Sequence, residues 1–205
     1  MNGQFFRSLV LTLCIGALAG CGGGGPKLEK LEPNAVVLAF GDSLTFGTGA
    51  KPSEAYPAAL ERAIGRKVVN AGVPGEISEA GLQRLPEVLE EVKPKLLILC
   101  HGGNDFLQKL EDAKAVANIR SMIQLAKSQN IQVVLMATPK PGLPPSVPVF
   151  YEEIAKEFGI PFEDGVIKSV LFDSSLKSDL VHPNAKGYEQ MAEAIAKKLK
   201  KAGAI

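Results

Sequence analysis

The sequence is poor in the residue types on which several classes of function depend. Only two histidines occur in 205 residues, which excludes most metal sites built from several histidines. Three cysteines are too few for a dense disulfide framework. Neither sign of charge is in large excess, with 23 Lys and Arg against 22 Asp and Glu, so no strong positive field is available to hold nucleic acid. With 46% hydrophobic and 22% charged residues, the composition is that of an ordinary globular domain whose chemistry depends on few residues.

An apolar run of about 20 residues, the length that spans a bilayer as a helix, is also missing. The N-terminus instead has the layout of a secretion signal, with Arg7 followed by a shorter apolar run at residues 9–18 and then small residues. Cys21 follows Leu-Ala-Gly and precedes four glycines. This pattern resembles the lipobox of bacterial lipoproteins, in which the chain is cut before the cysteine and the thiol carries a diacylglycerol. An ordinary cleaved signal, with an incidental cysteine, is the alternative.

The lipoprotein interpretation divides the chain into three parts. Residues 1–20 are the expected signal peptide, residues 21–34 the lipidated cysteine with a glycine-rich tether, and residues 35–205 the folded domain. It predicts a protein of the bacterial cell envelope, held at the membrane by acyl chains on Cys21 and without a helix in the bilayer. The mature chain then keeps Cys100 as its free thiol, so no intrachain disulfide is expected.

From residue 35 onward, short apolar runs alternate with amphipathic stretches. Continuously apolar runs of this length are typical of strands buried on both faces. The expected strands are residues 35–40, 67–71, 96–100 and 133–137, with a short edge strand at 159–162. Apolar residues at helical spacing predict helices around residues 82–92, 116–126 and 188–199, with Pro86 marking a helix start or a kink. The alternation predicts a parallel sheet with helices on both faces.

The polar residues best suited to chemistry come after the expected strands, where functional groups gather in parallel α/β sheets. They lie in four segments: Gly41-Asp42-Ser43-Leu44-Thr45, Asn70-Ala71-Gly72-Val73-Pro74-Gly75-Glu76, Gly102-Gly103-Asn104-Asp105 and Asp179-Leu180-Val181-His182-Pro183. Each segment alone has a simple structural explanation, such as a helix cap or a turn. Together they supply a nucleophile, two oxyanion donors and an acid–histidine pair at one edge of one sheet.

These four segments resemble the motif blocks of the SGNH hydrolases, also called GDSL esterases and lipases. The similarity is greatest to the bacterial thioesterase, lysophospholipase and arylesterase branch, and the blocks span residues 41–183. The resemblance implies an α/β fold, a three-layer α/β/α sandwich with a flavodoxin-like parallel sheet of about five strands. The sequence lacks a G-x-S-x-G nucleophile elbow, which argues against an ordinary α/β-hydrolase.

The resemblance also implies three catalytic roles. Ser43 is the expected nucleophile, which needs a neighbouring base because a free hydroxyl is weakly nucleophilic. His182 is the expected base, and then the acid that protonates the leaving group. Asp179 is expected to orient the imidazole and to stabilise its charged form, with Asp173 as a more distant alternative.

The family pattern assigns the oxyanion site to the backbone N–H groups of Ser43 and Gly75 and to the side chain of Asn104. Gly72 is an alternative to Gly75, although the spacing from the preceding Asn-Ala pair favours Gly75. No metal and no organic cofactor is implied.

Adjacent Cys100 and His101 invite a cysteine–histidine dyad. Successive side chains of a strand point to opposite faces, however, so the two groups are not expected to meet. Cys100 is therefore interpreted as an inert buried thiol, and His101 as a residue of the pocket wall or of a buried network.

The substrate is less well determined than the reaction. The resemblance favours a small-molecule or lipid acyl ester, such as an aryl ester, a lysophospholipid or an acyl thioester, acted on by a monomer. The candidate substrate-binding residues are Asp42, Leu44, Phe106, Leu107 and Leu143, the last within the proline-rich segment 139–148. A carbohydrate or cell-wall O-acetyl esterase of the same fold, a metallophosphoesterase and a non-catalytic binding lipoprotein are the alternatives.

Overall fold

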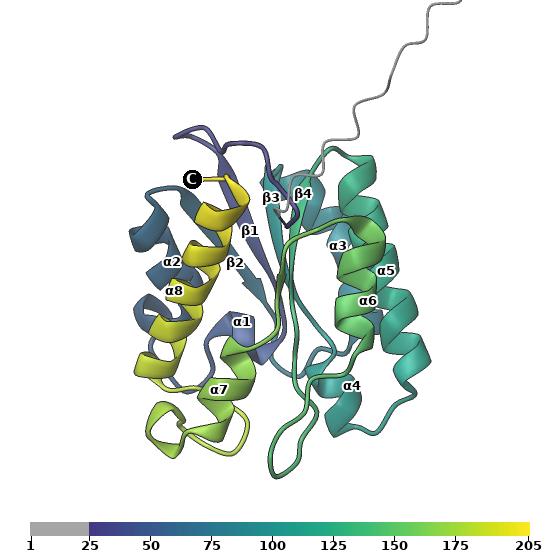
Figure 1. The fold of residues 1–205 in the computed structure, drawn as a ribbon, viewed down its shortest axis with the longest axis vertical. Coiled ribbons are helices and arrows are strands. Elements are labelled where there is room, and N and C mark those ends of the chain that lie inside the picture. The colour runs from purple at the N-terminus through teal and green to yellow at the C-terminus, as the bar shows by residue number, and fades with distance from the viewer. Residues whose placement is uncertain (1–24) are drawn as a thin grey trace, which may run out of the picture.

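The computed structural model describes residues 25–205, which form a five-stranded parallel sheet in the order β2-β1-β3-β4-β5 (Figure 1). The strands are β1 (Val36–Gly41), β2 (Lys67–Gly72), β3 (Leu96–Cys100), β4 (Gln132–Met136) and β5 (Phe162–Glu163). The expected parallel sheet of about five strands is confirmed. The expected signal peptide (residues 1–20) and Cys21, the expected lipidation residue, lie outside the described residues.

Helices cover both faces of the sheet and make the three layers (Figure 1). The α-helices are α1 (Ser43–Phe46), α2 (Tyr56–Ile64), α3 (Ser78–Val92), α4 (Gly103–Leu107), α5 (Asp112–Ser128), α6 (Phe150–Phe158), α7 (Val166–Phe172) and α8 (Ala185–Ala202). Two 3-10 turns are added, η1 (Pro52–Glu54) and η2 (Ser174–Leu176). Helices α2, α7 and α8 lie on one face, and α3, α5 and α6 lie on the other.

The central strands are apolar throughout because the core continues on both of their faces. Along β1, Val37 and Ala39 pack into the core beneath α2 and α8, whereas Leu38 and Phe40 pack into the core beneath α3 and α5. All four side chains are fully buried. This two-sided burial explains why the alternating polar pattern of a half-exposed strand is absent.

Among the expected elements, the edge strand and the helix that contains Pro86 differ most from expectation. The edge strand β5 is shorter and begins at Phe162, because the residues before it only contribute the Pro161 carbonyl, which accepts from the Leu135 N–H at 3.0 Å. Helix α3 begins at Ser78 and runs through Pro86, so the proline is not a helix start.

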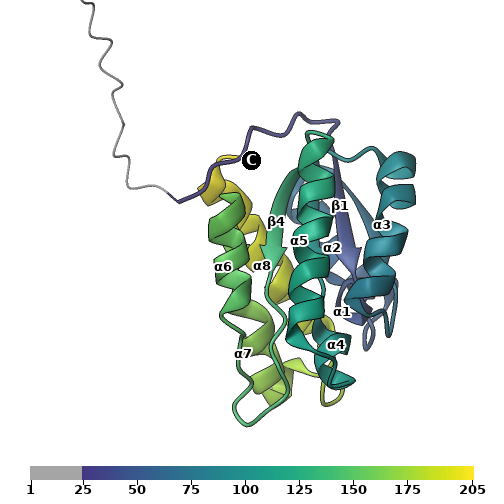
Figure 2. The ribbon, with the colours of Figure 1, turned by 90° about the vertical axis from the view of Figure 1, so that its right-hand side faces the viewer.

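The start of the described chain and the C-terminus lie together at the end of the sheet where the strands begin. The Leu28 and Leu31 N–H groups donate to the carbonyls of Ala202 and Ala204, at 2.9 and 2.8 Å. Helices α1, α4 and α7 lie at the opposite end in both views (Figures 1 and 2). The strand-end segments that carry the candidate site are therefore remote from the start of the described chain. Within residues 25–205, no helix has the length and apolarity needed to cross a membrane.

Candidate active site

Ser43 is the first residue of α1, immediately beyond the carboxyl end of β1. The side chain of Asp42 caps this short helix, with Oδ1 accepting from the Leu44 N–H at 3.0 Å. Gly72 allows the helix to sit directly beside β2, because a Cβ at that position would lie 2.1 Å from the Phe46 nitrogen. The strand, the cap and this close approach fix the position of the Ser43 hydroxyl.

The loop before α8 brings an imidazole to this hydroxyl. His182 Nε2 lies 3.0 Å from Ser43 Oγ, and His182 Nδ1 lies 2.8 Å from Asp179 Oδ2. The other carboxylate oxygen, Oδ1, accepts from the backbone N–H groups of Val181 and His182, at 2.8 and 2.9 Å. The structure therefore joins the three residues of the expected triad in one hydrogen-bonded chain.

The order of these bonds defines what each atom can do. Partial burial opposes ionisation of Asp179, but the hydrogen bonds from His182 and the backbone outweigh it and lower the pKa of that carboxyl below its ordinary value. An ionised Asp179 accepts from Nδ1–H, which leaves Nε2 free to accept the proton of Ser43. Asp173, the alternative acid, instead accepts from the backbone N–H and hydroxyl of Ser175, both at 2.8 Å.

Gly75 and Asn104 lie beside the serine. Both line the same cavity as Ser43 and His182. Gly75 has a positive φ of 79°, a conformation that glycine adopts at little cost, and a Cβ at this position would point into open space. The N–H of Gly72 is occupied by Asn70 Oδ1 at 2.9 Å, so of the two glycines only Gly75 is placed to donate into the cavity.

The cavity has a volume of about 740 Å³, within the usual range for small-molecule sites. Apolar side chains dominate its lining, among them Leu44, Leu107 and Leu143 as expected, with prolines of the segment 139–148. Sequence reasoning missed Leu171, Phe172 and Leu180. Leu180 could have been found from its position between the acid and the histidine, whereas no sequence signal pointed to the end of α7.

Two candidate substrate-binding residues lie elsewhere. Asp42 is 2% exposed and turned inward, because its carboxylate caps α1 and accepts from Asn104. Phe106 is also buried and packs against Phe150 and Tyr151, with ring centroids 6.2 and 6.5 Å apart. Neither residue lines the cavity that contains Ser43.

Cys100 and His101 occupy opposite faces of the sheet, as the alternation of a strand requires. The Cys100 thiol belongs to the core beneath α2 and α8, and burial raises its pKa far above the ordinary value. The His101 ring is fully buried on the other face, with its centroid 5.4 Å from that of Phe40. This arrangement excludes a Cys100–His101 dyad and leaves an inert thiol.

His101 belongs to a buried charged network below Gly75, one of the two roles expected for it, whereas its partners Glu76 and Arg84 were not expected from the sequence. Arg84 donates to Glu76 through Nε and Nη2, both at 2.8 Å, and its Nη2 also donates to the Ala71 carbonyl at 3.0 Å. Nε2 of His101 lies 3.3 Å from Glu76 Oε2, close but without the alignment of a hydrogen bond. Burial by itself would raise the pKa of Glu76, but Arg84 and His101 outweigh it and hold that pKa at about 2.

This pKa predicts an acid-dependent loss of stability that a Glu76→Gln variant lacks. A carboxyl whose pKa falls from 4.5 to about 2 on folding stabilises the fold above pH 4.5, and this contribution disappears as the pH falls toward 2. The difference in free energy of unfolding between wild type and Glu76→Gln should therefore narrow below pH 4.5, by up to about 3 kcal/mol. Denaturant titrations at pH 7, 4.5 and 3 measure it. A difference that does not change with pH contradicts the assignment, and the exposed Glu79→Gln is the matched control.

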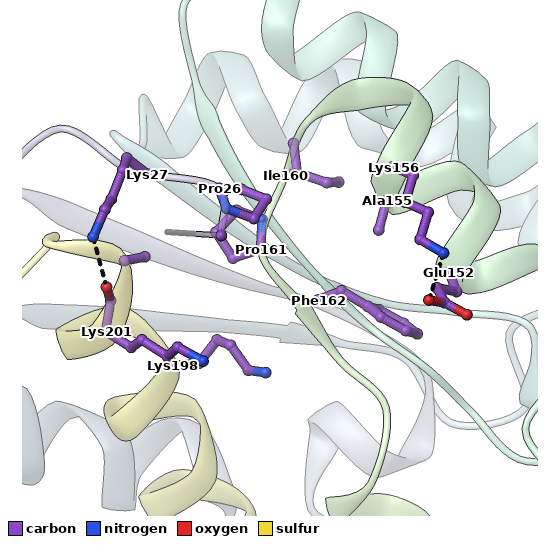
Figure 3. Close-up of a pocket in the computed structure, with 12 residues that line it drawn as sticks. Pro26, Lys27, Glu152, Ala155, Lys156, Ile160, Pro161, Phe162, Lys198 and Lys201 are labelled. Atoms are coloured by element: carbon purple, nitrogen blue, oxygen red, sulfur yellow. Dashed lines mark hydrogen bonds and ion pairs between the residues drawn. The ribbon is translucent and has the colours of Figure 1, made fainter. Parts of the chain in front are cut away.

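A second cavity, of about 280 Å³, lies at the other end of the sheet (Figure 3). Three of its four lysines are already engaged, since Lys27 donates to the Lys201 carbonyl at 3.3 Å, Lys156 pairs with Glu152 at 2.7 Å, and Lys198 pairs with Glu163 at 3.4 Å. The described residues that line it include no serine, cysteine, histidine or aspartate. It therefore lacks the groups of a nucleophilic site. Across residues 25–205, no group of three or more His, Cys, Asp or Glu side chains is arranged to hold a metal ion.

Comparison with known proteins places this geometry in a family. Residues 39–190 match the model of the GDSL-like Lipase/Acylhydrolase family. The chain is 30% identical over 171 residues to thioesterase 1/protease 1/lysophospholipase L1 of Escherichia coli K12, covering 80% of this chain and 82% of that protein. It is 27% identical over 208 residues to an arylesterase of Vibrio mimicus, covering 95% and 96%.

A solved structure agrees with the sequence relatives. The crystal structure of AlinE4, an SGNH-hydrolase family esterase, superposes with a TM-score of 0.65 at 32% identity, covering 84% of this chain and 98% of AlinE4. The expected fold and the expected ester hydrolase are both confirmed. The chain belongs to the GDSL-like Lipase/Acylhydrolase family, and it is an ester hydrolase with the SGNH fold.

Proposed function

We propose that this protein is a serine esterase that hydrolyses acyl esters or thioesters through an acyl-enzyme on Ser43. The observation that carries the proposal is the hydrogen-bonded chain from Ser43 through His182 to Asp179 at the wall of an apolar cavity. A hydroxyl, a neutral imidazole and a carboxylate in this order are the parts of a nucleophilic hydrolase.

The first half of the reaction forms the acyl-enzyme. His182 Nε2 takes the proton of Ser43 while Oγ attacks the acyl carbon, and the carbonyl oxygen becomes an oxyanion. The backbone N–H groups of Ser43 and Gly75 and the Asn104 amide donate to that oxyanion. The bond to the leaving group then breaks, and His182 gives its proton to the departing alkoxide or thiolate.

The second half repeats these steps with water. Water gives a proton to His182 and attacks the acyl carbon, and collapse of the second tetrahedral intermediate returns the proton to Ser43 Oγ and releases the carboxylic acid. Asp179 stays ionised throughout and stabilises the imidazolium that forms in each half. One chain supplies every group, so we propose that the monomer is active.

The substrate class follows from the cavity. Leu143 is fully exposed, and Leu180 and Phe172 are 87% and 65% exposed, although all three line the same cavity. Large apolar side chains exposed together indicate a surface that a ligand covers. We propose an acyl chain as that ligand, in an aryl ester, a lysophospholipid or a thioester, in line with the names of the relatives from Escherichia coli and Vibrio mimicus.

The test is the rate of hydrolysis of nitrophenyl esters from acetyl to dodecanoyl by the full chain in detergent, with Ser43→Ala as the blank. We expect kcat/KM to rise with chain length, by up to about fourfold for each buried methylene at ~0.8 kcal/mol. Leu143→Ala should flatten this rise, whereas Val149→Ala, an exposed apolar residue outside the cavity, should not. Activity confined to acetyl esters would favour the O-acetyl esterase, and no activity in a folded sample would favour a binding protein.

We also propose that the protein is anchored in the bacterial cell envelope through a lipid on Cys21. The support is the lipobox-like sequence and the position of the start of the described chain, which lies at the end of the sheet opposite to α1, the helix that begins with Ser43 (Figure 1). The cavity would then face away from the anchor. Mass spectrometry of the N-terminal peptide tests this proposal, because an unmodified Cys21 thiol would refute it.

A further inference from the structure

Glu76, the residue that follows Gly75, is a buried and firmly held charged side chain outside the triad. Its side chain is 6% exposed, and both carboxylate oxygens accept from Arg84 at 2.8 Å. The Arg84 guanidinium is itself fixed, because it lies 4.2 Å above the ring of Phe40 and donates to the Ala71 carbonyl. Glu76 is thus bound to α3 and, through Arg84, to β2.

The other side of this carboxylate is closed by His101. The ring is fully buried with Nε2 3.3 Å from Glu76 Oε2, and a Cβ at Gly81 would lie 2.5 Å from Nε2. Helix α3 therefore packs directly on the imidazole and leaves the ring no room to move away. Substantial freedom of the Glu76 side chain would require either His101 or Arg84 to move.

The backbone of Glu76 reaches the oxyanion site. Its carbonyl accepts from Asn104 Nδ2 at 3.0 Å, and its N–H closes a turn by donating to the Val73 carbonyl at 3.2 Å. Gly75 is inside that turn and is directly bonded to Glu76. One residue thus determines the position of two of the expected oxyanion donors, the Gly75 N–H and the Asn104 amide.

The two hydrogens of the Asn104 amide are not held equally. The Glu76 carbonyl binds one of them at 3.0 Å, whereas the second contact of Nδ2, to Asp42 Oδ2, is longer at 3.3 Å. An oxyanion accepts a hydrogen bond more strongly than the distant Asp42 Oδ2 does. It can therefore take the second amide hydrogen while the first stays bonded to the Glu76 carbonyl. The Glu76 carbonyl thereby sets the direction in which Asn104 donates.

We propose that Glu76 is a positioning residue of the oxyanion site, fixed by Arg84 and His101 so that Gly75 and Asn104 converge beside Ser43. The proposal rests on the serine esterase function described above. Glu76 touches no substrate in this role, since its carboxylate lies in the buried network and only its backbone faces the donors. The cost of losing the side chain should therefore appear in the transition state, where the oxyanion exists, and not in substrate binding.

Steady-state kinetics of Glu76→Ala on a nitrophenyl ester test this role. We expect kcat to fall by about tenfold to 10²-fold, less than the loss of a donor itself, with KM changed by less than about threefold. In Glu76→Gln, kcat should fall less, because the amide oxygen still accepts one Arg84 hydrogen. This variant also replaces Glu76→Ala in the test if the alanine variant does not fold. Glu79→Gln, on the exposed first turn of α3, is the matched control.

Two kinetic results would overturn the proposal. One is a kcat equal to that of wild type in folded Glu76→Ala. The other is a loss of kcat/KM that lies entirely in KM, which would make the network part of the binding surface. Arg84→Gln should lower kcat in the same direction as Glu76→Gln, because it removes the partner that fixes the carboxylate.

A second readout does not depend on turnover. The side-chain amide of Asn104, assigned by its loss in Asn104→Ala, should give two resolved proton signals in wild type and move toward the signals of a solvated amide in Glu76→Ala. Unchanged signals would refute the positioning role even in an inactive protein. If wild type hydrolysed no ester but the Asn104 amide signals still moved in Glu76→Ala, the esterase function alone would be refuted.

Discussion

Replacing His182 by alanine should lower kcat for an aryl ester by about 10⁴-fold or more, while the protein stays folded. The imidazole is the one base within hydrogen-bonding distance of Ser43 Oγ in the described part of the chain, at 3.0 Å. Without it the hydroxyl keeps its proton during attack and the leaving group departs unprotonated, so only the oxyanion site and substrate binding contribute to the rate. His182 is partly exposed, at 19% of its side-chain surface, so little packing is lost. Steady-state hydrolysis, with circular dichroism to establish folding, measures the effect.

His101→Ala is the informative comparison, since it removes the other histidine of the chain. Its ring is fully buried and faces Glu76, not Ser43, so its loss should cost stability and part of the rate but leave measurable turnover. If His101→Ala were inactive and His182→Ala active, the assignment of the base would be wrong.

Asn104→Ala should lower kcat by about 10²–10³-fold with little change in KM. The amide lines the cavity beside Ser43 and is held by the Glu76 carbonyl at 3.0 Å, so it is oriented before substrate arrives. A donor aimed at the oxyanion stabilises charge that is absent from the ground-state ester, and its removal therefore slows the chemical step without weakening binding. The ratio of kcat between variant and wild type on an acetyl ester, which makes few other contacts, gives the cleanest measure.

Asn118→Ala provides the control, because Asn118 is a partly buried asparagine whose amide donates to Ser78 Oγ at 2.9 Å, away from the cavity. It should retain wild-type kcat. Equal losses of kcat in Asn104→Ala and Asn118→Ala would mean that Asn104 acts through the stability of the fold. An unchanged kcat in Asn104→Ala would show that this residue does not belong to the oxyanion site.

Much of the sheet could be predicted because its strands are short, apolar and buried on both faces. Strand β3 was predicted with the bounds that the structure shows, residues 96–100. The edge strand was less predictable, since only two of its residues pair with β4. The residues just before it are a proline, Pro161, and the end of helix α6. Helices α2, α6 and α7 were not predicted, nor were the short helices α1 and α4. In α1 and α4, four or five residues are too few to show a helical period.

The members of the site could be predicted because they follow strand ends, but the directions of neighbouring side chains could not. Asp42 and Phe106 stand one and two residues from Ser43 and Asn104, yet both turn inward, one to cap a helix and the other to pack on Tyr151. The Glu76–Arg84–His101 network also has no sequence signature, because its members come from a loop, a helix and a strand end that only the fold brings together.

The nucleophile and its base are 139 residues apart in the chain. Helix α8 follows the base and packs on α2, and its Tyr188 hydroxyl donates to the Thr48 carbonyl at 2.8 Å, just after α1. A nascent chain that has not yet reached residue 182 therefore carries the serine without the group that activates it. In the proposed mechanism, esterolytic competence is therefore acquired only once residue 182 has been made, and a shorter nascent chain lacks the base that Ser43 needs.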